Sequence, residues 1–511
     1  MTPPAGEASR QDLRLVPAAL TCWAVTAVGI LWGPPAAIGV VVVAVAATAF
    51  AMHRYRRGQS TVPAAWPAVL AVGIIGGAFS IAVALRVHDV DHHPLASRFG
   101  TTAEVVVSPI ESPRPLGGAR LMFRGSLTAL DGHALSGRVV VFAPIVGYGE
   151  LTAGRPATFR ARIVRPTRSD LTVAVLSAVG TPKLGDAGVI QRLAAGVRRQ
   201  FAASARAVLP PDQAAMVPAL VLGDTSLLSR RTIDEFRVAG LTHLTAVSGA
   251  NVTIVCGAVL LAAVLLGPRV AVALAALALI AFVIVVQPSA SVLRAAVMGG
   301  ITLVAVASHR RRQAIPALSA CVIALMIAAP ELAVDVGFAL SVLATAGLVV
   351  IAPVWSRRLV SRGWPKPLAD AISVAVAAQL VTAPLIAGIS GTLSLVSVAA
   401  NLAVAVVIPP ITVIGTAAAI LSTIWPGCAQ LLIRFTGPET WWLLRVAHWG
   451  AALPGAAVPV PSGLAGVVVV ATAALSSVVL WRWRWGRRGL GVAAVCLLAW
   501  AVSGSHDTIG A

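Results

Sequence analysis

Apolar runs long enough to cross a lipid bilayer recur along the whole chain and restrict it to one class of protein. A transmembrane helix needs about 20 mostly apolar residues. Charged residues make up only 11% of the 511 residues, against about a quarter in soluble proteins. We therefore predict a polytopic α-helical membrane protein with about 11–13 transmembrane helices. The predicted spans are 16–32, 35–52, 64–85, 244–266, 269–287, 291–307, 314–329, 334–353, 368–389, 392–408, 410–424, 463–480 and 488–504.

Clusters of basic residues between these spans predict how the chain is oriented. Lys and Arg concentrate in cytoplasmic loops, and the strongest clusters lie at 53–58, 308–313, 356–367 and 481–488. An even number of predicted spans separates each pair of clusters, so all of them can lie in the cytoplasm together with the N-terminus. The same count places residues 86–243 outside the membrane. Much of the net charge of +20 is thereby explained without nucleic acid.

The region outside the membrane has the pattern of a small β domain. Short β-rich runs between Glu104 and Val179 are separated by turn residues such as Asp131-Gly132. Five short strands of this kind suit a β-barrel of the oligonucleotide-binding (OB) type, and another five-stranded barrel or a sandwich also fits. The predicted domains are N-terminal transmembrane helices at 1–85, an extracytoplasmic OB-like domain at 86–185, an amphipathic interfacial helix at 186–210, a channel core at 211–425 and a C-terminal transmembrane region at 426–511.

Arginines are concentrated in the predicted β domain, where the rule for cytoplasmic loops does not apply. Residues 98–182 contain ten arginines, no lysine and five acids. The guanidinium group binds phosphate as a planar fork, although few aromatic residues accompany these arginines for base stacking. A basic surface beside anionic lipid is the alternative explanation. The candidates for nucleic-acid contacts are Arg114, Arg120, Arg124, Arg138, Arg160, Arg162, Arg165 and Arg168.

The segment after the β domain predicts an amphipathic helix on the membrane surface. Helical spacing places Ile190, Leu193, Val197, Phe201 and Val208 on one face. Arginines 192, 199 and 206 lie on the opposite face. We expect this helix to lie in the outer interface and to tether the β domain to the membrane region.

Polar residues inside predicted spans are costly and usually face the protein interior or a water-filled path. Either pore lining or hydrogen bonding between helices explains them. Arg294 and Asp335 lie near the outer ends of their spans, where they could pair or flank a pore. The candidate pore or channel residues are His243, Ser248, Gly249, Asn251, Arg294, Asp335, Gln379 and Asn401.

Two patterns suggest catalytic or metal chemistry, and we favour neither. AVSG at 246–249 is similar to the Gly-x-Ser-Gly of rhomboid proteases, but His243 precedes Ser248 by a spacing that is poor for a dyad. His88, Asp91, His92 and His93 are weak candidates for a metal site, and we favour a polar cluster beside the membrane as their explanation. We expect no catalytic residue, bound metal or cofactor.

Six stretches, taken in order, identify a resemblance to one family. They are ALVLGDTSLLS at 219–229, FRVAGLTHLTAVSGANV at 236–252, SVLRAAVMGG at 291–300, DVGFALSVLATAGL at 335–348, AAQLVTAPL at 377–385 and SLVSVAANLAVAVVIPP at 394–410. Together they resemble the ComEC-type competence proteins, membrane channels for DNA uptake in bacteria. The common family version has a histidine after SGL, where this chain has Ala250 and Asn251. Any role of that histidine would pass to an amide here or be absent.

The resemblance implies a channel in the bacterial cell membrane that carries single-stranded DNA inward during natural transformation. Many members have a C-terminal metallo-β-lactamase-like domain, and this chain has no His-x-His-x-Asp-His motif. We therefore expect a short form that is not an enzyme and works with a separate nuclease. GxxxxGK[ST] is also missing from the sequence, so energy would come from a cytoplasmic helicase or strand-binding protein. An outer DNA receptor, membrane lipid and possible homo-oligomers complete the expected partners.

Two other functions fit parts of the pattern. A transporter or channel for a different solute would share only its ancestry with the family. A serine intramembrane hydrolase would use Ser248 as its nucleophile.

Overall fold

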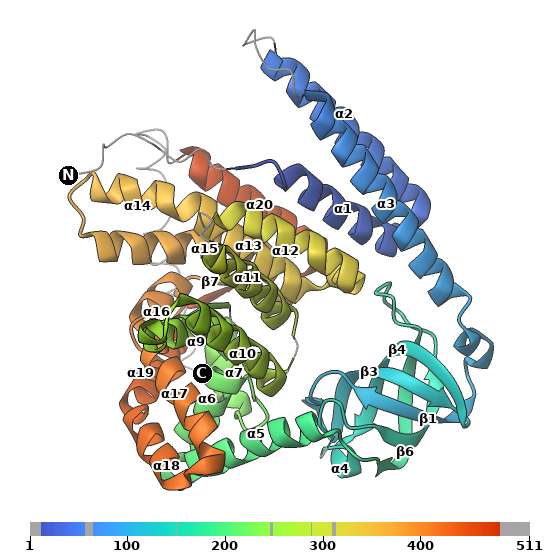
Figure 1. Ribbon diagram of the computed structural model, residues 1–511, viewed down its shortest axis with the longest axis vertical. Coiled ribbons are helices and arrows are strands. Elements are labelled where there is room, and N and C mark those ends of the chain that lie inside the picture. Colours follow the sequence, from blue (N-terminus) through green and yellow to red (C-terminus); the bar gives the residue numbers. More distant parts are fainter. Residues whose placement is uncertain are drawn as a thin grey trace, which may run out of the picture. The chain divides into compact units, whose positions relative to one another are not determined.

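The computed structural model describes residues 12–56, 65–149, 151–245, 249–287, 289–308 and 313–480. Two compact units make up the chain. Unit 1 contains Met1–Gly196 and Val259–Ala339, and unit 2 contains Val197–Ala258 and Leu340–Ala511. Helices dominate both units, and most of the strands form one β-barrel (Figure 1). The predicted fold class, a polytopic helical membrane protein with one small barrel, is confirmed.

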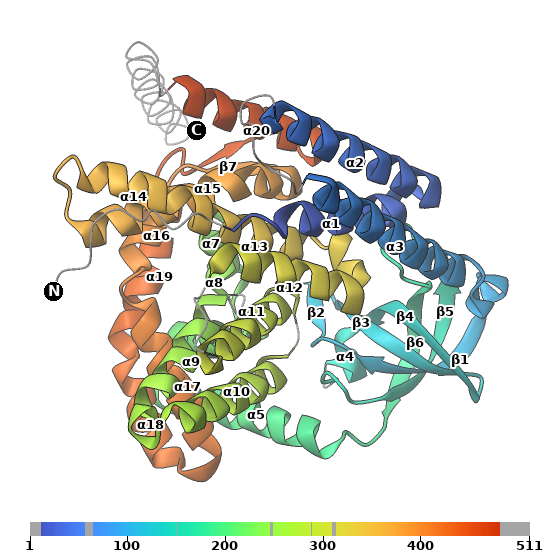
Figure 2. The same cartoon turned by 45° about the horizontal axis from the view of Figure 1, so that its top comes forward.

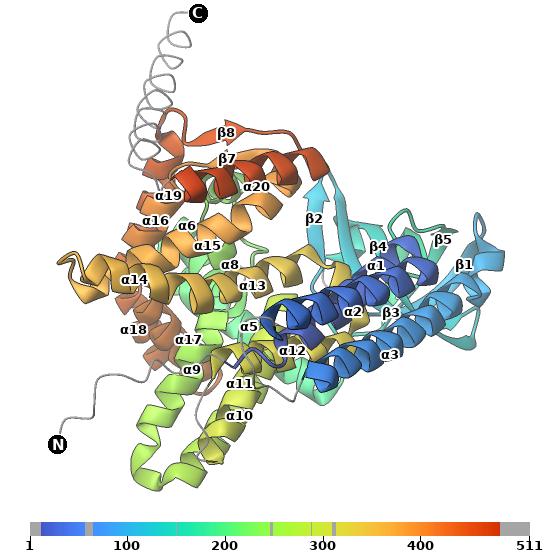
Figure 3. The ribbon, with the colours of Figure 1, turned by 90° about the horizontal axis from the view of Figure 1, so that it is seen from above.

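Unit 1 begins with three apolar helices that pack against one another (Figure 3). They are α1 (Val16–Trp32), α2 (Pro34–Arg56) and α3 (Ala65–Asp91). Gly33 has a φ of 87° and is followed by Pro34, so the chain turns sharply and the next helix starts with a preset φ. The same Gly-Pro turn precedes α10, where Gly267 has a φ of 96° and Pro268 starts the helix. The later helices of this unit are α10 (Pro268–Val286), α11 (Ala290–Ala307) and α12 (Ala314–Ala328), followed by the short η3 (Pro330–Val334).

The β domain is a closed five-stranded barrel with OB-type strand order. Its strands pair in the order β1, β5, β6, β4 and β3, and β3 returns to β1. All neighbours are antiparallel except β4 and β6, which are parallel. The barrel strands are β1 (Thr102–Pro109), β3 (Arg120–Leu130), β4 (His133–Pro144), β5 (Ala157–Val164) and β6 (Ala174–Leu184). The short β2 (Arg114–Gly117) extends the barrel as a hairpin with β3 (Figure 2).

Alternation of side chains explains why these segments form a barrel. Along β1, Ala103, Val105 and Val107 are buried while the residues between them point outward. Asp131 and Gly132 both have positive φ, 46° and 81°, as the predicted two-residue hairpin turn requires. The Asp131 carboxylate also accepts a bond from the Glu104 N–H at 3.0 Å. A short η1 (Pro94–Arg98) and the turn α4 (Ile145–Tyr148) flank the barrel.

The described residues of unit 2 are helical apart from one small strand pair. Its elements are α6 (Pro211–Leu222), α7 (Arg230–Val238), α8 (Thr242–Thr245), η4 (Gly347–Ile351), α14 (Ala352–Val360), α15 (Lys366–Ser390), α16 (Ser397–Val404), α17 (Ile408–Ile424), α18 (Pro426–Phe435), α19 (Gly437–Ala452) and α20 (Gly463–Leu480). Helices α5 (Val189–Val208), α9 (Gly249–Ala262) and α13 (Val336–Ala346) run from one unit into the other, and η2 (Val264–Leu266) follows α9. Strands β7 (Thr392–Ser394) and β8 (Ala457–Pro459) pair antiparallel beside α20 (Figure 3).

Each helix that is long and apolar enough to cross a membrane coincides with one of the thirteen predicted spans. Six such helices occur in the part of the chain that the structure describes, or up to seven with the bent pair α16 and α17. Four shorter apolar helices, Val16–Trp32, Pro34–Phe50, Asn251–Ala262 and Ala314–Ala328, occupy further predicted spans. The predicted span 488–504 lies outside the described residues.

Three predicted spans look different in the structure. The predicted spans 392–408 and 410–424 form the bent pair α16 and α17, which changes direction by 54°, as a broken span or a re-entrant segment does. The predicted span 244–266 is realised only by α9, whose 14 residues measure about 21 Å. Part of its polar N-terminal stretch, at 246–248, lies outside the described residues.

The predicted amphipathic helix forms as α5, but its apolar face is not uniform. Phe201 is fully buried, whereas Ile190 and Leu193 are exposed. The N-terminal half of α5 therefore keeps an exposed apolar face, and the C-terminal half packs into unit 2. Its placement at the membrane surface stays a prediction.

Candidate functional site

The barrel arginines fall into two groups according to the element that carries them. Arg120 and Arg124 lie on β3, Arg138 lies on β4, and Arg114 lies on the β2 hairpin. In OB barrels the second and third strands form the face that binds oligonucleotides. Those strands correspond to β3 and β4 here, because β2 lies outside the closed barrel. The first group of arginines therefore lies on or beside the barrel face that is expected to bind oligonucleotides.

The second group lies on β5 and the loop that follows it. Arg160 and Arg162 alternate with buried residues of β5 and point outward, and Arg165 and Arg168 follow in the loop before β6. All are exposed. Arg165 stacks over the Phe99 ring at 5.7 Å, which orients its guanidinium. Below, the four arginines 160, 162, 165 and 168 are called the basic strip. None of them forms an ion pair with a carboxylate in the described part of the chain.

Two arginines of the first group are held by acids from the helical part of unit 1. Arg124 Nη1 lies 3.5 Å from Asp335 Oδ2, and Arg138 forms an ion pair with Glu331. The pKa of Arg138 is below its ordinary value, because burial disfavours the charge and Arg124 repels it. A third contact joins the barrel region to the helical part of unit 1. There Ser112 Oγ donates a hydrogen bond to Gln287 Oε1 at 2.9 Å.

Asp335 therefore has a partner other than the one that its sequence position suggested. Asp335 forms an ion pair with Arg124 and not with Arg294, the partner that we considered from the sequence. Asp335 Oδ1 also caps α13 by accepting a bond from the Phe338 N–H at 2.9 Å. Arg294 is buried on α11, donates to Met298 Sδ at 3.2 Å and accepts a bond from Cys321 through its carbonyl. Its position suits helix packing in unit 1.

Unit 2 brings two other predicted residues together in one polar network. Ser397 Oγ donates to Gln379 Oε1 at 3.0 Å. Asn401 Nδ2 donates to the Ser397 carbonyl at 2.8 Å and lies 3.4 Å from the Gly240 carbonyl. Ser394 Oγ adds a bond to the Val238 carbonyl at 2.7 Å. Three motifs that lie far apart in the sequence, around 240, 379 and 397–401, therefore meet where α15, α16 and the end of α7 converge.

Gly240 is the residue that permits this close approach. Its φ is +71°, and a Cβ added there would lie 2.5 Å from Ser397 Cβ and Oγ. The position thus requires both a left-handed backbone and the lack of a side chain. Asn401 and Ser397 sit one helical turn apart on α16, which lets the amide reach both the carbonyl and the hydroxyl of Ser397.

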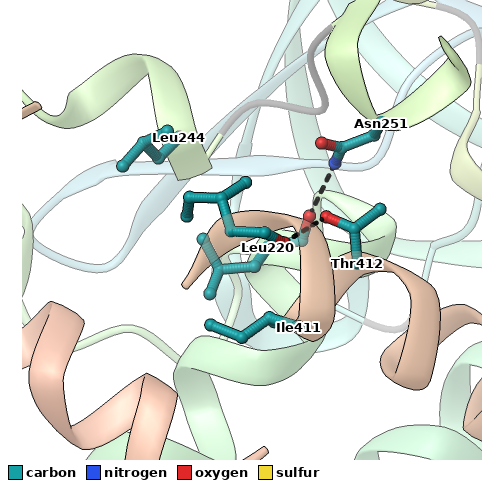
Figure 4. A pocket seen from close by; sticks show the side chains of 6 residues that line it. Leu220, Leu244, Asn251, Ile411 and Thr412 are labelled. Carbon is teal, nitrogen blue, oxygen red and sulfur yellow. Dashed lines mark hydrogen bonds between the residues drawn. The ribbon is translucent and has the colours of Figure 1, made fainter. Parts of the chain in front are cut away.

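Asn251 makes a separate contact between helices of unit 2 (Figure 4). Only 4% of the residue is exposed, and its Nδ2 donates to the Leu220 carbonyl at 2.9 Å. Thr412, Ile411 and Leu244 line the same small cavity. Its volume of about 10 Å³ has room for a single water at most. The contact fits helix packing better than the lining of an open path.

We expect Asn251→Ala to lower the free energy of unfolding by about 1–2 kcal/mol, because the buried Leu220 carbonyl loses its donor. Thermal or denaturant unfolding of the full chain in detergent measures this change. Thr253→Ala is the matched control, since the Thr253 hydroxyl bonds only the Gly249 carbonyl of its own helix. A stability equal to that of the control, combined with lost transport, would assign Asn251 to the path instead.

Among the remaining predicted residues, His243 forms a hydrogen bond with the Gly240 backbone and so adjoins the polar network of unit 2. His243 is exposed on the short α8, Gly249 begins α9, and Ser248 lies outside the described residues. The ring of His93 bonds the Ser136 carbonyl and the Leu95 N–H, while the His88 and His92 rings stack at 4.0 Å. No group of three or more metal-binding side chains is found in the described ranges.

Sequence reasoning missed Glu331 and Ser397. Glu331 follows Pro330 between two apolar runs, and an acid beside a membrane end is a signal that could have singled it out. Ser397 lies within a quoted motif, but serines are frequent in helices and nothing local distinguishes it. Only its contacts with Gln379 and Asn401 do so.

Comparisons with known proteins agree with this organisation. ComE operon protein 3 of Bacillus subtilis (strain 168) is 26% identical over 208 residues, which cover 40% of this chain and 26% of that protein. The aligned segment thus spans about a quarter of the relative. No solved structure matches the chain. The profile of the family described as Competence protein matches residues 220–485, just over half of the chain, and it includes the whole polar network of unit 2. The chain belongs to the Competence protein family.

Proposed function

We propose that this protein carries single-stranded DNA across the bacterial cell membrane during natural transformation. The observation that carries the proposal is the OB-type barrel, whose strands β3, β4 and β5 and the loop after β5 carry arginines. Family membership supports a role in DNA uptake. The barrel would face outward and attract the strand by its positive charge.

The membrane part of the path is proposed to lie in the channel core at 211–425. Neutral polar groups suit such a path, because they replace water without holding phosphate tightly. The network of Gln379, Ser397 and Asn401 provides groups of this kind beside the bent pair α16 and α17. Broken helices within a membrane are tolerated where they are buried or line a cavity. An outer receptor would deliver the DNA, and a cytoplasmic helicase or strand-binding protein would draw it in.

Two measurements on the full chain test the proposal. A strain lacking the protein should fail to take up labelled DNA, and the intact gene should restore uptake. The purified chain in detergent should bind an oligothymidine with an affinity that falls steeply as salt rises, because phosphate contacts release counterions. Normal uptake in the deletion strain, together with no binding at low salt, would indicate transport of another solute.

A further inference from the structure

The face of the barrel expected to bind DNA is occupied by carboxylates of the same chain. Arg124 on β3 and Arg138 on β4 are neighbours on that face, and they meet Asp335 and Glu331. Glu331 lies in η3 and Asp335 directly follows it, between the apolar helices α12 and α13. A phosphate of a bound strand would need the same guanidinium groups.

The acids stand on a well-packed support. Leu332 and Ala333 between them are buried. The Trp23 indole donates to the Ala333 carbonyl at 2.9 Å, and its ring packs edge-on against Phe338 at 5.5 Å. The carboxylates are therefore held in place by α1 and α13, and the arginines are the side chains free to change partner.

The ion pairs are accessible enough to exchange. The arginine side chains are 45% and 37% exposed, and their acidic partners are 19% and 18% exposed. Ion pairs at such surfaces shift an equilibrium by only about 1.4- to 5-fold each. A strand that brings several phosphates at once can compete with contacts of this strength.

We propose that Glu331 and Asp335 form an acidic latch that covers the DNA-binding face of the barrel and yields to the phosphates of an arriving strand. The inference rests on the proposed function. In the closed state Arg124 and Arg138 pair with the latch. In the bound state they pair with phosphate, while the basic strip, which has no such partners, makes the first contact.

The test compares binding of a fluorescent oligothymidine to the full chain in a neutral detergent over a range of salt concentrations. The latch variant is Glu331→Gln/Asp335→Asn. Asparagine is as good a helix cap as aspartate, so the cap of α13 is kept while the charge is lost. The matched control, Asp212→Asn/Asp234→Asn, removes two acids from α6 and α7. A third variant, Arg124→Gln/Arg138→Gln, removes the competing groups.

If the latch exchanges with DNA, the latch variant binds the oligothymidine roughly 2- to 30-fold tighter than the wild type does. The slope of log K against log salt is the same in both. The control variant binds like the wild type. In the arginine variant the slope of log K against log salt is shallower by about 1.4, because two phosphate contacts are lost.

Equal affinity of the latch variant and the wild type at every salt concentration overturns the proposal. The proposal is also overturned if log K falls more steeply with log salt in the latch variant than in the wild type, because the arginines would then not reach phosphate in the wild type. If the wild type binds no oligonucleotide at low salt, the proposed function itself fails.

Discussion

Replacing Gly240 with alanine is expected to destabilise the protein by about 2–5 kcal/mol. About 1–2 kcal/mol comes from placing a side chain at a φ of +71°, and about 1–3 kcal/mol comes from forcing a methyl group against Ser397. Because the displaced Ser397 also bonds Gln379 and Asn401, the junction of three motifs would be disturbed together. We expect DNA uptake to be lost. Unfolding in detergent measures the stability, and uptake of labelled DNA measures the function.

Gly463 offers a matched control for this prediction. It has nearly the same φ, +72°, but an added Cβ there would have no heavy atom within 4 Å. Gly463→Ala should therefore show the backbone strain without the clash. Equal destabilisation of the two variants would mean that contact with Ser397 contributes nothing.

Neutralising the basic strip is expected to remove most of the salt dependence that this barrel gives to DNA binding. Each phosphate contact with a single strand contributes about 0.7 to the slope of log K against log salt, so replacing Arg160, Arg162, Arg165 and Arg168 with glutamine should make it shallower by about 2.8. At 0.1 M salt this corresponds to an affinity loss on the order of several hundred-fold. Titration of the full chain with oligothymidine at several salt concentrations measures both quantities.

The control for the strip uses arginines that already have carboxylate partners. Arg98 lies 3.5 Å from Asp131, and Arg114 lies 2.8 Å from Glu111. The variant Arg98→Gln/Arg114→Gln should lose much less affinity per charge removed. If its loss per charge equals that of the strip variant, binding depends on net charge alone and the division into two groups has no functional meaning.

Local patterns were sufficient to predict the elements of the fold. Apolar run length predicted the membrane helices, because a bilayer tolerates no unpaired backbone group. Short β-rich runs separated by turn residues such as Asp131-Gly132 predicted the β domain. In the structure each strand buries one face, and the Asp131-Gly132 turn has positive φ. The predicted span 244–266 is longer than the helix α9, because polar residues precede that helix.

The membrane polar residues show where prediction from sequence ends. Their cost in lipid indicated that Gln379, Asn401 and Asn251 either line a pore or form hydrogen bonds between helices. Which partners they have depends on packing between helices that are distant in sequence. Asn251 contacts Leu220, and Asn401 approaches Gly240. No local spacing encodes these contacts.

The sequence by itself determined the class of protein and the family, and it predicted a small β domain that could be a barrel or a sandwich, since each depends on periodicity or on ordered motifs. Only the tertiary structure decided which arginines are available to a ligand. Arg124 and Arg160 are equivalent in the sequence, because both are outward-facing residues of short strands. In the folded chain Asp335 neutralises Arg124, while Arg160 keeps its charge exposed. The physical reason is that a charge interacts with what lies within a few ångströms in space, and residues 211 positions apart are brought that close only by folding.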